Sequence, residues 1–436
     1  MNLRKPVIYG LLYLSGSKIP RYLNEIEKVD KLSKEEIKEY QAKKLKKLLL
    51  HAYENVPYYH KVLEGIVVKD GKVDLGKFEE IPVLSRDILT KEFDNLKSKD
   101  LKNRKWFLNH SGGSTGNPVA FIQDNDYWDS NVANKIYYAH LNGKIIGEKE
   151  IKLWGSDKDI LQGTIGFKAK VQNFLYNRIF LNSFNMNENK IEDYIKIINK
   201  EKPKLLWGYV NSLEILSDYI IEKDMKVYSP KIIFSAAGTL TNDMRAKIKK
   251  AFNTKVVNIY GTREVGDVAF ETKENGGLMI TDYSHKLEVD ENGRILITTL
   301  NNYSMPLIRY DIGDISSGFD SKINSKFSVL KDVIGRRTSI FKTKDGKKIP
   351  PEYFIHMVGV AFNTGFIKKF QVIQKNYDKI LVKIVLNSDK DINQLKKIES
   401  SIKKVMGTNC KVKFEFVDEI KSNKSGKYLY TVSEVR

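Results

Sequence analysis

The strongest constraint on the fold of this chain is an alternation of short apolar runs with amphipathic segments between residues 205 and 259. Residues 205–209, 231–235 and 255–259 are mostly apolar and are predicted to be buried strands. Residues 212–223 and 241–252 lie between them and have the apolar spacing of helices. Because strands that alternate with helices form largely parallel sheets, we expect an α/β domain here.

Two further regions complete the predicted architecture. A turn at residues 291–293 leads into an apolar segment, residues 293–300, which we expect to be an antiparallel strand. Near the C-terminus, residues 379–386 and 411–417 are predicted strands on either side of an amphipathic helix at residues 391–406. This second pattern is typical of a small α+β domain.

A length of 436 residues suits a large domain followed by a small one. We predict an α/β fold whose N-terminal domain, residues 1–338, has mixed, largely parallel sheets. The small α+β domain would then span residues 339–436. Residues 33–36 read Ser-Lys-Glu-Glu, the capping box that opens a helix.

The charge balance is basic, with 74 Lys and Arg against 54 Asp and Glu, a net charge of +20. These basic residues are spread along the chain without an arginine-rich arm, so we expect no nucleic-acid partner. A diffuse positive field also suits acidic small molecules or a negatively charged membrane surface. The single cysteine, Cys410, excludes an internal disulfide framework.

The N-terminus carries a short apolar run, residues 7–14, directly after Arg4 and Lys5. No stretch approaches the roughly 18 to 20 apolar residues of a membrane span, so we expect a cytoplasmic protein. The run is too short and lacks a convincing cleavage site for a signal peptide. It is interpreted either as a helix packed on the domain or as a peripheral contact with the cytoplasmic face of the membrane.

The first segment that could carry chemistry is SGGSTGNP at residues 111–118. Glycine lets the backbone approach an anion closely, and hydroxyls can donate to phosphate oxygens or ligate Mg²⁺. The segment lacks the Gly-Lys-Ser/Thr ending of a Walker A loop. Taken alone, it also fits an ordinary surface loop.

Three charged residues follow in later segments. Glu264, in YGTRE, comes after the predicted strand at residues 255–259, and ligands of open α/β sheets bind at the carboxyl ends of strands. It could hold a metal ion or pair with Arg263. Asp314, in RYDIGD, could accept hydrogen bonds from a ribose diol or cap a tight turn. Lys427, in SGK, could also be a solvated surface lysine.

Together, the order and spacing of SGGSTGNP, YGTRE, RYDIGD, GRR (residues 335–337) and SGK resemble the adenylate-forming ligases. This superfamily holds acyl-CoA synthetases, firefly luciferase and the adenylation domains of peptide synthetases. Within it the chain looks most like the branch of phenylacetate–CoA ligases, CapK and coenzyme F390 synthetase-like proteins. NVPYY at residues 55–59 and MPLIRY at residues 305–310 support that branch, and the resemblance covers residues 35–436.

The resemblance implies a role for each matching residue. Those implied to bind ATP are Ser111, Gly112, Gly113, Ser114, Thr115, Gly116, Ala236, Ala237, Gly238, Tyr260, Gly261, Thr262, Asp314 and Arg336. Glu264 would bind Mg²⁺ as a catalytic metal ligand, and the catalytic Lys427 would bridge the substrate carboxylate and the α-phosphate. Those implied to bind the acyl substrate are Trp207, Gly208, Tyr209 and Phe184, although each could equally be a core residue, the interpretation favoured for Phe184. Ser339, where the family has an acidic residue, would be the hinge of a mobile C-terminal lid domain.

The implied activity is that of an ATP- and Mg²⁺-dependent ligase, which makes an acyl-adenylate from a carboxylic acid and passes it to a thiol or an amine. CoA would be the cofactor where the acceptor is a thiol. CapK-type members are often associated with capsule or O-antigen genes, which suggests polysaccharide biosynthesis as the setting. Two alternatives stay open: a nucleotidyltransferase that adenylates a cofactor, and a non-catalytic scaffold in polysaccharide assembly.

Overall fold

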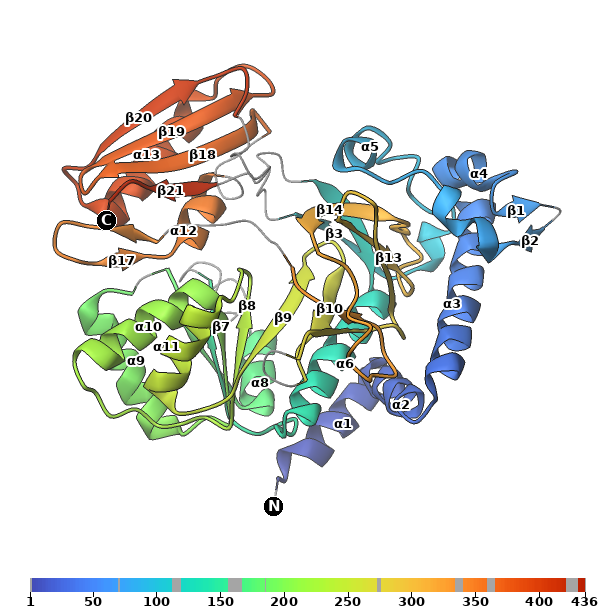
Figure 1. Cartoon of the computed structure of the whole chain (residues 1–436), viewed down its shortest axis with the longest axis horizontal. Coiled ribbons are helices and arrows are strands. Elements are labelled where there is room, and N and C mark those ends of the chain that lie inside the picture. The colour runs from blue at the N-terminus through green and yellow to red at the C-terminus, as the bar shows by residue number, and fades with distance from the viewer. Residues whose placement is uncertain are drawn as a thin grey trace.

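The computed structural model describes residues 2–69, 71–111, 119–155, 167–184, 186–272, 276–333, 340–358, 365–420 and 430–435 (Figure 1). Across these residues the main sheet has the strand order β15-β11-β10-β9-β8-β7-β5-β6. Its parallel part consists of β5 (Glu150–Leu153), β6 (Arg178–Leu181), β7 (Leu205–Tyr209), β8 (Ile232–Ala236) and β9 (Val256–Thr262). The predicted α/β fold with a largely parallel sheet is therefore confirmed.

The antiparallel part of the sheet begins with the β9–β10 hairpin. Three short strands complete it: β10 (Gly266–Phe270), β11 (Leu278–Ile280) and β15 (Val329–Leu330). The prediction ended β9 at Ile259, but the strand runs on through Thr262. A Cβ atom on Gly261 would collide with the carbonyl oxygen of Gly266, so only glycine permits this close pairing.

Helices cover both faces of the main sheet (Figure 1). Ile195, Leu216 and Ile248 belong to the buried cluster on one face, and Ala133 and Tyr137 to that on the other. The first face is covered by α9 (Glu188–Glu201), α10 (Val210–Glu222) and α11 (Asn242–Phe252). The second is covered by α1 (Arg4–Leu14), α2 (Ile19–Val29), α6 (Asn125–Leu141) and α8 (Phe167–Tyr176). The two helices predicted between residues 205 and 259 are α10 and α11.

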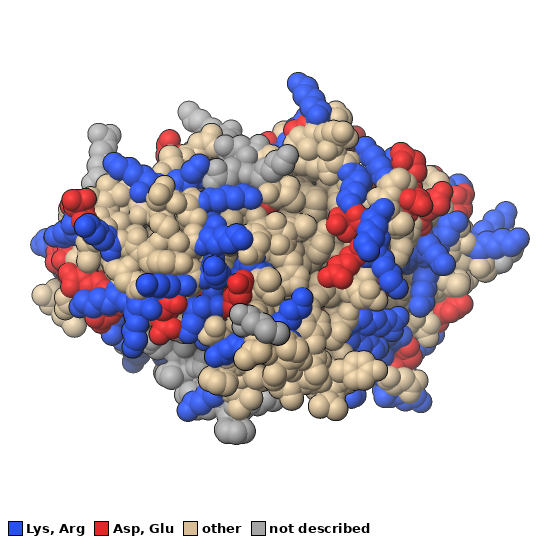
Figure 2. Space-filling model, turned by 90° about the horizontal axis from the view of Figure 1, so that it is seen from below, with Lys and Arg blue, Asp and Glu red and all other residues tan. Residues whose placement is uncertain are grey.

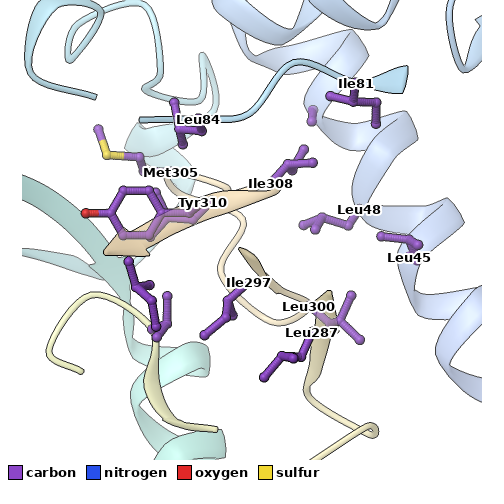
Figure 3. Close-up of a cluster of buried hydrophobic side chains, with 14 of the residues drawn as sticks. Leu45, Leu48, Ile81, Leu84, Leu287, Ile297, Leu300, Met305, Ile308 and Tyr310 are labelled. Carbon is purple, nitrogen blue, oxygen red and sulfur yellow. The ribbon is translucent and has the colours of Figure 1, made fainter. Parts of the chain in front are cut away.

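A second core lies between the long helix α3 (Lys34–Asn55) and a three-stranded antiparallel sheet (Figure 3). Leu45 and Leu48 of α3 lie with Ile297, Leu300 and Tyr310 in one buried cluster. That sheet consists of β12 (His285–Val289), β13 (Arg294–Thr299) and β14 (Tyr310–Ile315), so the antiparallel strand predicted at residues 293–300 is confirmed. The capping box at Ser33 is also present: Ser33 and Glu36 each accept a hydrogen bond from the other's backbone N–H.

Shorter elements connect these cores. They are α4 (Pro57–Leu63), β1 (Val68–Lys69), β2 (Lys72–Val73), the 3-10 turns Leu75–Glu80 and Leu101–Asn103, α5 (Arg86–Lys91), β3 (Trp106–His110) and β4 (Ala120–Asp124). Strands β3 and β4 pair antiparallel, and the segment SGGSTGNP lies between them in the sequence.

The C-terminal part forms its own four-stranded sheet, in the order β20-β19-β18-β21. Its elements are β16 (Phe341–Lys342), β17 (Lys348–Ile349), α12 (Pro351–His356), β18 (Ile367–Asn376), β19 (Lys379–Leu386), α13 (Ile392–Met406), β20 (Lys411–Phe416) and β21 (Thr431–Ser433). The parallel pair β19 and β20 with its connecting helix α13 confirms the predicted pattern. The proposed boundary at residues 338 and 339 lies outside the described residues.

The N-terminal apolar run is indeed helical, but only part of α1 is covered. Ile8 is buried, whereas Leu14 is 84% exposed and Leu11 is 43% exposed. Within the described part of the chain, no helix is long and apolar enough to cross a membrane.

Candidate ATP and acyl-substrate site

The predicted adenine segment lies at the carboxyl end of β8, beside the end of β9. Ala236 is the last residue of β8, and Ser235 pairs with Asn258, which brings the segment level with Tyr260. Ala237 adopts a left-handed backbone conformation with φ of 62°. A non-glycine residue in this conformation costs of order 1–3 kcal/mol, and such strain concentrates at functional sites.

Tyr260 and Asp314 come together although 54 residues separate them. The Tyr260 hydroxyl donates a hydrogen bond of 3.1 Å to Oδ2 of Asp314, which joins β9 to β14. Both side chains are half-buried, so the aromatic ring and the carboxylate are partly accessible to solvent. The alternative interpretation of RYDIGD as an Asx turn also applies, because Asp311 Oδ1 accepts a hydrogen bond from the Gly313 N–H.

Glu264 lies in the turn between β9 and β10, where its side chain is only 4% exposed. Its carboxylate forms an ion pair of 2.8 Å with Arg86 of α5 rather than with Arg263, the partner considered from the sequence. The Gln123 amide holds this turn by donating hydrogen bonds to the backbone carbonyls of Arg263 and Glu264. A salt bridge between residues so far apart leaves no local sequence signal.

Mg²⁺ fits this arrangement as an ion that arrives with the nucleotide. Among the described residues no group of three or more His, Cys, Asp or Glu side chains is placed to hold a metal ion. Proteins commonly bind Mg²⁺ through one or two carboxylates together with substrate phosphates, and Glu264 offers one carboxylate.

His285 is a further buried residue at this turn, and no sequence motif indicated it. Its Nε2 lies 2.8 Å from the carbonyl oxygen of Val265, so Nε2 carries the proton, and Nδ1 faces the hydroxyls of Thr281 and Ser284. Burial lowers the pKa of His285 to about 4. The neutral imidazole thus fixes the residue that follows Glu264.

We expect this histidine to make the fold acid-sensitive. The folded state keeps His285 neutral down to about pH 4, whereas the unfolded chain takes up a proton near pH 6.5. The stability that the neutral form contributes is therefore complete above pH 6.5 and is lost between pH 6.5 and 4. Linkage gives a loss of about 2 kcal/mol between pH 7 and 5. Urea unfolding at both pH values measures it.

The control for this prediction is a pair of histidine variants. His285→Gln removes the titrating group, so its free energy of unfolding should fall less between pH 7 and 5 than that of the wild type. The exposed His60→Gln should keep the wild-type difference. Equal slopes for all three proteins would contradict a role for His285.

Several predicted residues lie outside the described part of the chain: Gly112, Gly113, Ser114, Thr115, Gly116, Arg336, Ser339 and Lys427. Ser111 is described and fully buried. Its N–H donates to the Val119 carbonyl, and its hydroxyl oxygen accepts from the Val119 N–H, both at 2.9 Å. Ser111 therefore pins the two ends of the predicted phosphate loop together.

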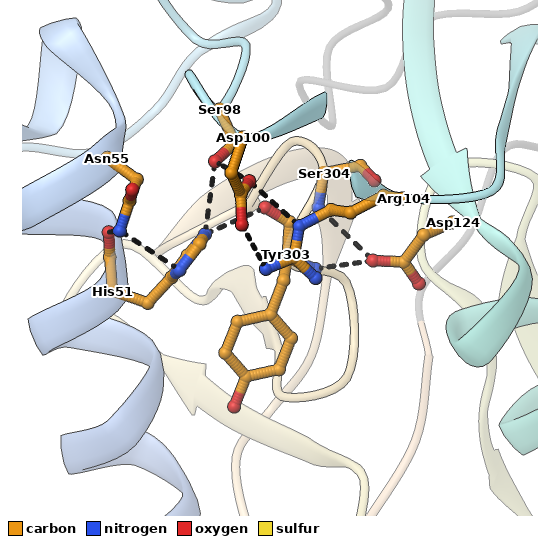
Figure 4. A network of polar contacts seen from close by, with 8 residues as sticks. All are labelled: His51, Asn55, Ser98, Asp100, Arg104, Asp124, Tyr303 and Ser304. Atoms are coloured by element: carbon orange, nitrogen blue, oxygen red, sulfur yellow. Dashed lines mark hydrogen bonds and ion pairs between the residues drawn. The ribbon is translucent and has the colours of Figure 1, made fainter. Parts of the chain in front are cut away.

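A polar network anchors the hairpin that carries this loop (Figure 4). Asp124, at the end of β4, accepts hydrogen bonds from the backbone N–H groups of Tyr303 and Ser304. Hydrogen bonds from Arg104, together with one from Ser98, lower the pKa of Asp100 to about 2. The Asp124 contacts join the end of β4 to the loop that precedes β14, and the Arg104–Asp100 pair braces the segment that leads into β3.

The predicted acyl-binding residues divide into two groups. Trp207 faces α6 inside the main core, with the Lys152 ammonium 4.4 Å from its ring centroid. Tyr209 packs on Trp154 at 4.3 Å and stacks with Phe184 at 6.2 Å, where the C-terminal unit covers them. Gly208 serves packing, because a Cβ atom there would lie 2.9 Å from Leu213.

A cavity of about 460 Å³ opens beside Trp207, between the sheet face and helices α1, α6 and α8. Its wall also includes Lys152 of β5 and Tyr176 of α8. Trp207 therefore borders a cavity, whereas no sequence motif marked the charged residues around it.

Comparison with known proteins finds similar chains over most of this sequence. Residues 341–434 match the family described as the CapK C-terminal domain. The chain is 26% identical to Protein CapK of Staphylococcus aureus, covering 98% of this chain and 96% of that protein. It is 22% identical to the phenylacetate-coenzyme A ligase of Aromatoleum evansii, covering 89% and 92%.

A solved structure shows the same fold. This is 2-hydroxyisobutyryl-CoA ligase in complex with 2-HIB-AMP and CoA in the thioesterification state, with a TM-score of 0.56 and 16% identity over 92% of this chain and 90% of that one. The fold is thus that of the adenylate-forming ligases. The relatives in sequence go further: the chain belongs to this superfamily of AMP-forming ligases, on its phenylacetate–CoA ligase and CapK-like branch.

Proposed function

We propose that this protein uses ATP to activate a carboxylic acid as an acyl-adenylate and then transfers the acyl group to the thiol of CoA or to an amine. The observation that supports the proposal is the Tyr260–Asp314 hydrogen bond, which joins an aromatic side chain of β9 to a carboxylate of β14. Membership of the AMP-forming ligases supports it.

The proposed first step is an attack of a substrate carboxylate oxygen on the α-phosphorus of ATP. The bond from that phosphorus to the β-phosphate oxygen breaks, and pyrophosphate leaves. Tyr260, Asp314 and the segment 236–238 would hold the adenosine, while the loop pinned by Ser111 would hold the phosphates. Mg²⁺, when bound at Glu264, neutralises phosphate charge. Lys427 would neutralise the charge that develops on the reacting oxygens.

In the proposed second step the acceptor sulfur or nitrogen attacks the acyl carbon, and AMP leaves with the electron pair of the broken C–O bond. The acceptor loses its proton in this step. CoA is the thiol that the relatives' names suggest. For a CapK-type member, an amino group on a capsule or O-antigen sugar is the proposed amine.

Pyrophosphate release across a panel of carboxylic acids tests the function. We expect release that depends on one class of acid, and hydroxylamine should trap the adenylate as a hydroxamate. Addition of CoA or an amino sugar should then replace the hydroxamate by a thioester or amide. Transfer of AMP to a non-carboxylate cofactor would favour the nucleotidyltransferase. Tight ATP binding with no turnover for any acid or cofactor would favour the scaffold.

We also propose that the C-terminal unit moves about Ser339 between the two steps. The buried cluster that includes Phe341, Phe370 and Ile402 lies mostly within the C-terminal unit and reaches the large domain at Phe184, which supports two domains. Because proline fixes φ, Ser339→Pro should slow acyl transfer about tenfold or more relative to adenylation. Single-turnover assays of each half-reaction measure this. Equal slowing of both, in a folded variant, would contradict the hinge.

We further propose that α1 and α8 make a peripheral contact with an anionic membrane. Leu14 and Phe174 are 84% and 70% exposed, and the Arg4 guanidinium lies 4.7 Å from the Phe174 ring centroid, so the apolar faces adjoin. The first acidic residue of the chain is Glu25, whereas four basic residues precede it: Arg4, Lys5, Lys18 and Arg21. Figure 2 views this lower side and shows a broad uncharged area with Lys and Arg around it. Apolar side chains beside basic ones favour an anionic bilayer.

Sedimentation with vesicles tests this contact. We expect binding to vesicles that contain phosphatidylglycerol and about tenfold weaker binding to pure phosphatidylcholine, since each basic group near an anionic surface contributes about 1 kcal/mol. Leu11→Gln with Leu14→Gln should weaken binding at least tenfold. Ile392→Gln, at an exposed position on the distant α13, is the matched control. Self-association without vesicle binding would instead assign the surface to a second copy.

A further inference from the structure

The cavity beside Trp207 lies close to the proposed adenylation site. Tyr209 of β7 pairs with Ala236 of β8, the residue that begins the predicted adenine segment. Trp207 is two residues earlier on the same strand and points to the same sheet face, so it lies roughly 7 Å below that level. The cavity thus occupies the position that a substrate would reach by extending down the sheet face from the strand ends.

The cavity wall carries an excess of positive charge. Four basic side chains line it, namely Lys135, Lys144, Lys152 and Arg178, against two acidic ones, Asp129 and Glu150. The single carboxylate of Glu150 forms ion pairs with both Lys144 and Arg178. The Asp129 carboxylate accepts hydrogen bonds from the Ser17 hydroxyl and the Lys18 backbone N–H.

Lys152 stands out among these four. Lys135 lies 3.7 Å from Asp267, but no described carboxylate forms an ion pair with Lys152. Desolvation, and next to it the charge of Arg178, lower the pKa of Lys152 well below its usual range. The Trp207 ring faces the ammonium at 4.4 Å, and a cation–π contact compensates burial only in part. A bound anion would satisfy this group.

We propose that the cavity binds the far end of the substrate acid and that this acid carries a second anionic group, which pairs with Lys152. The proposal rests on the proposed function, because it assumes that the first carboxylate is the one adenylated. Carboxylate and phosphate oxygens share the required chemistry. Lys152 would then be the residue that selects acids with two anionic ends over acids with one.

The test compares acids that differ only in their far end. Suitable pairs are hexanoate with adipate and phenylacetate with 4-carboxyphenylacetate, and 6-phosphonohexanoate provides the phosphonate arm. We expect kcat/KM for pyrophosphate release to be at least tenfold higher for the acids with two anionic ends. The acid with the higher kcat/KM, adipate or 6-phosphonohexanoate, identifies the class of anion that the cavity prefers.

Two lysine variants assign the preference to the cavity. Lys152→Met keeps the side-chain length without the charge, and it should reduce the preference to within threefold. Lys149→Met removes a charge one residue before the same strand, where Lys149 pairs with Glu201, and should keep the wild-type preference. Lys152→Arg should restore part of it. A wild-type preference for one-ended acids, unchanged in Lys152→Met, would overturn the proposal.

Binding without ATP separates this proposal from the proposed function. Calorimetry with adipate should show affinity that Lys152→Met weakens at least tenfold and Lys149→Met does not. If this pattern appears while no acid supports pyrophosphate release, the anion site stands and the ligase function fails. If acids are activated but adipate binds wild type and Lys152→Met equally, the ligase function stands and the anion site fails.

Discussion

Replacing Lys427 with alanine is expected to lower acid-dependent pyrophosphate release by about a hundred- to a thousandfold. The loss of one preorganised donor at developing charge typically costs about 2.7–4 kcal/mol in the transition state. The proposed role of Lys427 is to meet the charge shared between the attacking carboxylate and the α-phosphate. Single-turnover measurement with the true acid gives the rate.

Two further measurements, of ATP binding and of acyl transfer, separate this role from a general loss of structure. ATP binding by Lys427→Ala should stay within a few fold of the wild type, because adenosine contacts are assigned to other residues. Transfer from a pre-formed acyl-adenylate should remain largely intact, since the lysine acts in the first step only. Lys424→Ala removes a charge three residues earlier and should change neither step. An adenylation rate unchanged by Lys427→Ala would make Lys427 a solvated surface lysine.

The sequence was most informative about local structure. Each strand and helix predicted between residues 205 and 259, and between residues 379 and 417, exists within a few residues of its expected bounds. Apolar periodicity and caps such as Ser33 and Thr241 carry that information within a single segment. The β9 strand was predicted too short because the apolar run ends at Ile259, whereas Gly261 permits close strand pairing beyond it.

The surroundings of the site could not be predicted in the same way. The contacts of Glu264 with Arg86 and of Lys152 with Trp207 join distant segments. Neither Arg86 nor Lys152 belongs to a recognisable motif. His285 has no motif either, although its burial decides its charge. The Tyr260–Asp314 contact is different, because the resemblance to adenylate-forming ligases had already assigned both residues to one nucleotide.

Glu264→Gln is expected to lower kcat/KM for ATP-dependent activation by roughly a hundredfold and to raise the Mg²⁺ concentration needed for half-maximal rate. A metal ion at developing phosphate charge contributes several kcal/mol, and the neutral amide is a far poorer Mg²⁺ ligand than a carboxylate. The amide oxygen can still accept a hydrogen bond from Arg86, so the fold should be retained. Rates measured across a Mg²⁺ titration check this.

The buried Arg86–Glu264 pair offers a competing explanation, in which Glu264 serves structure alone. Arg86→Met separates the two. It removes the partner of a buried carboxylate, which typically costs about 3–5 kcal/mol of stability. It leaves the carboxylate available to Mg²⁺, so the folded variant should keep most of its rate, and Mg²⁺ with ATP should raise its melting temperature more than that of the wild type.

The double variant separates the effect on stability from the effect on activity. Arg86→Met with Glu264→Gln removes both charges, so its stability should exceed that of Arg86→Met alone, while its rate should stay as low as that of Glu264→Gln. Stability and activity would then follow different residues of one ion pair. If activity instead tracked stability across the three variants, with the same Mg²⁺ requirement in each, Glu264 would be a structural partner of Arg86 and the metal assignment would be wrong.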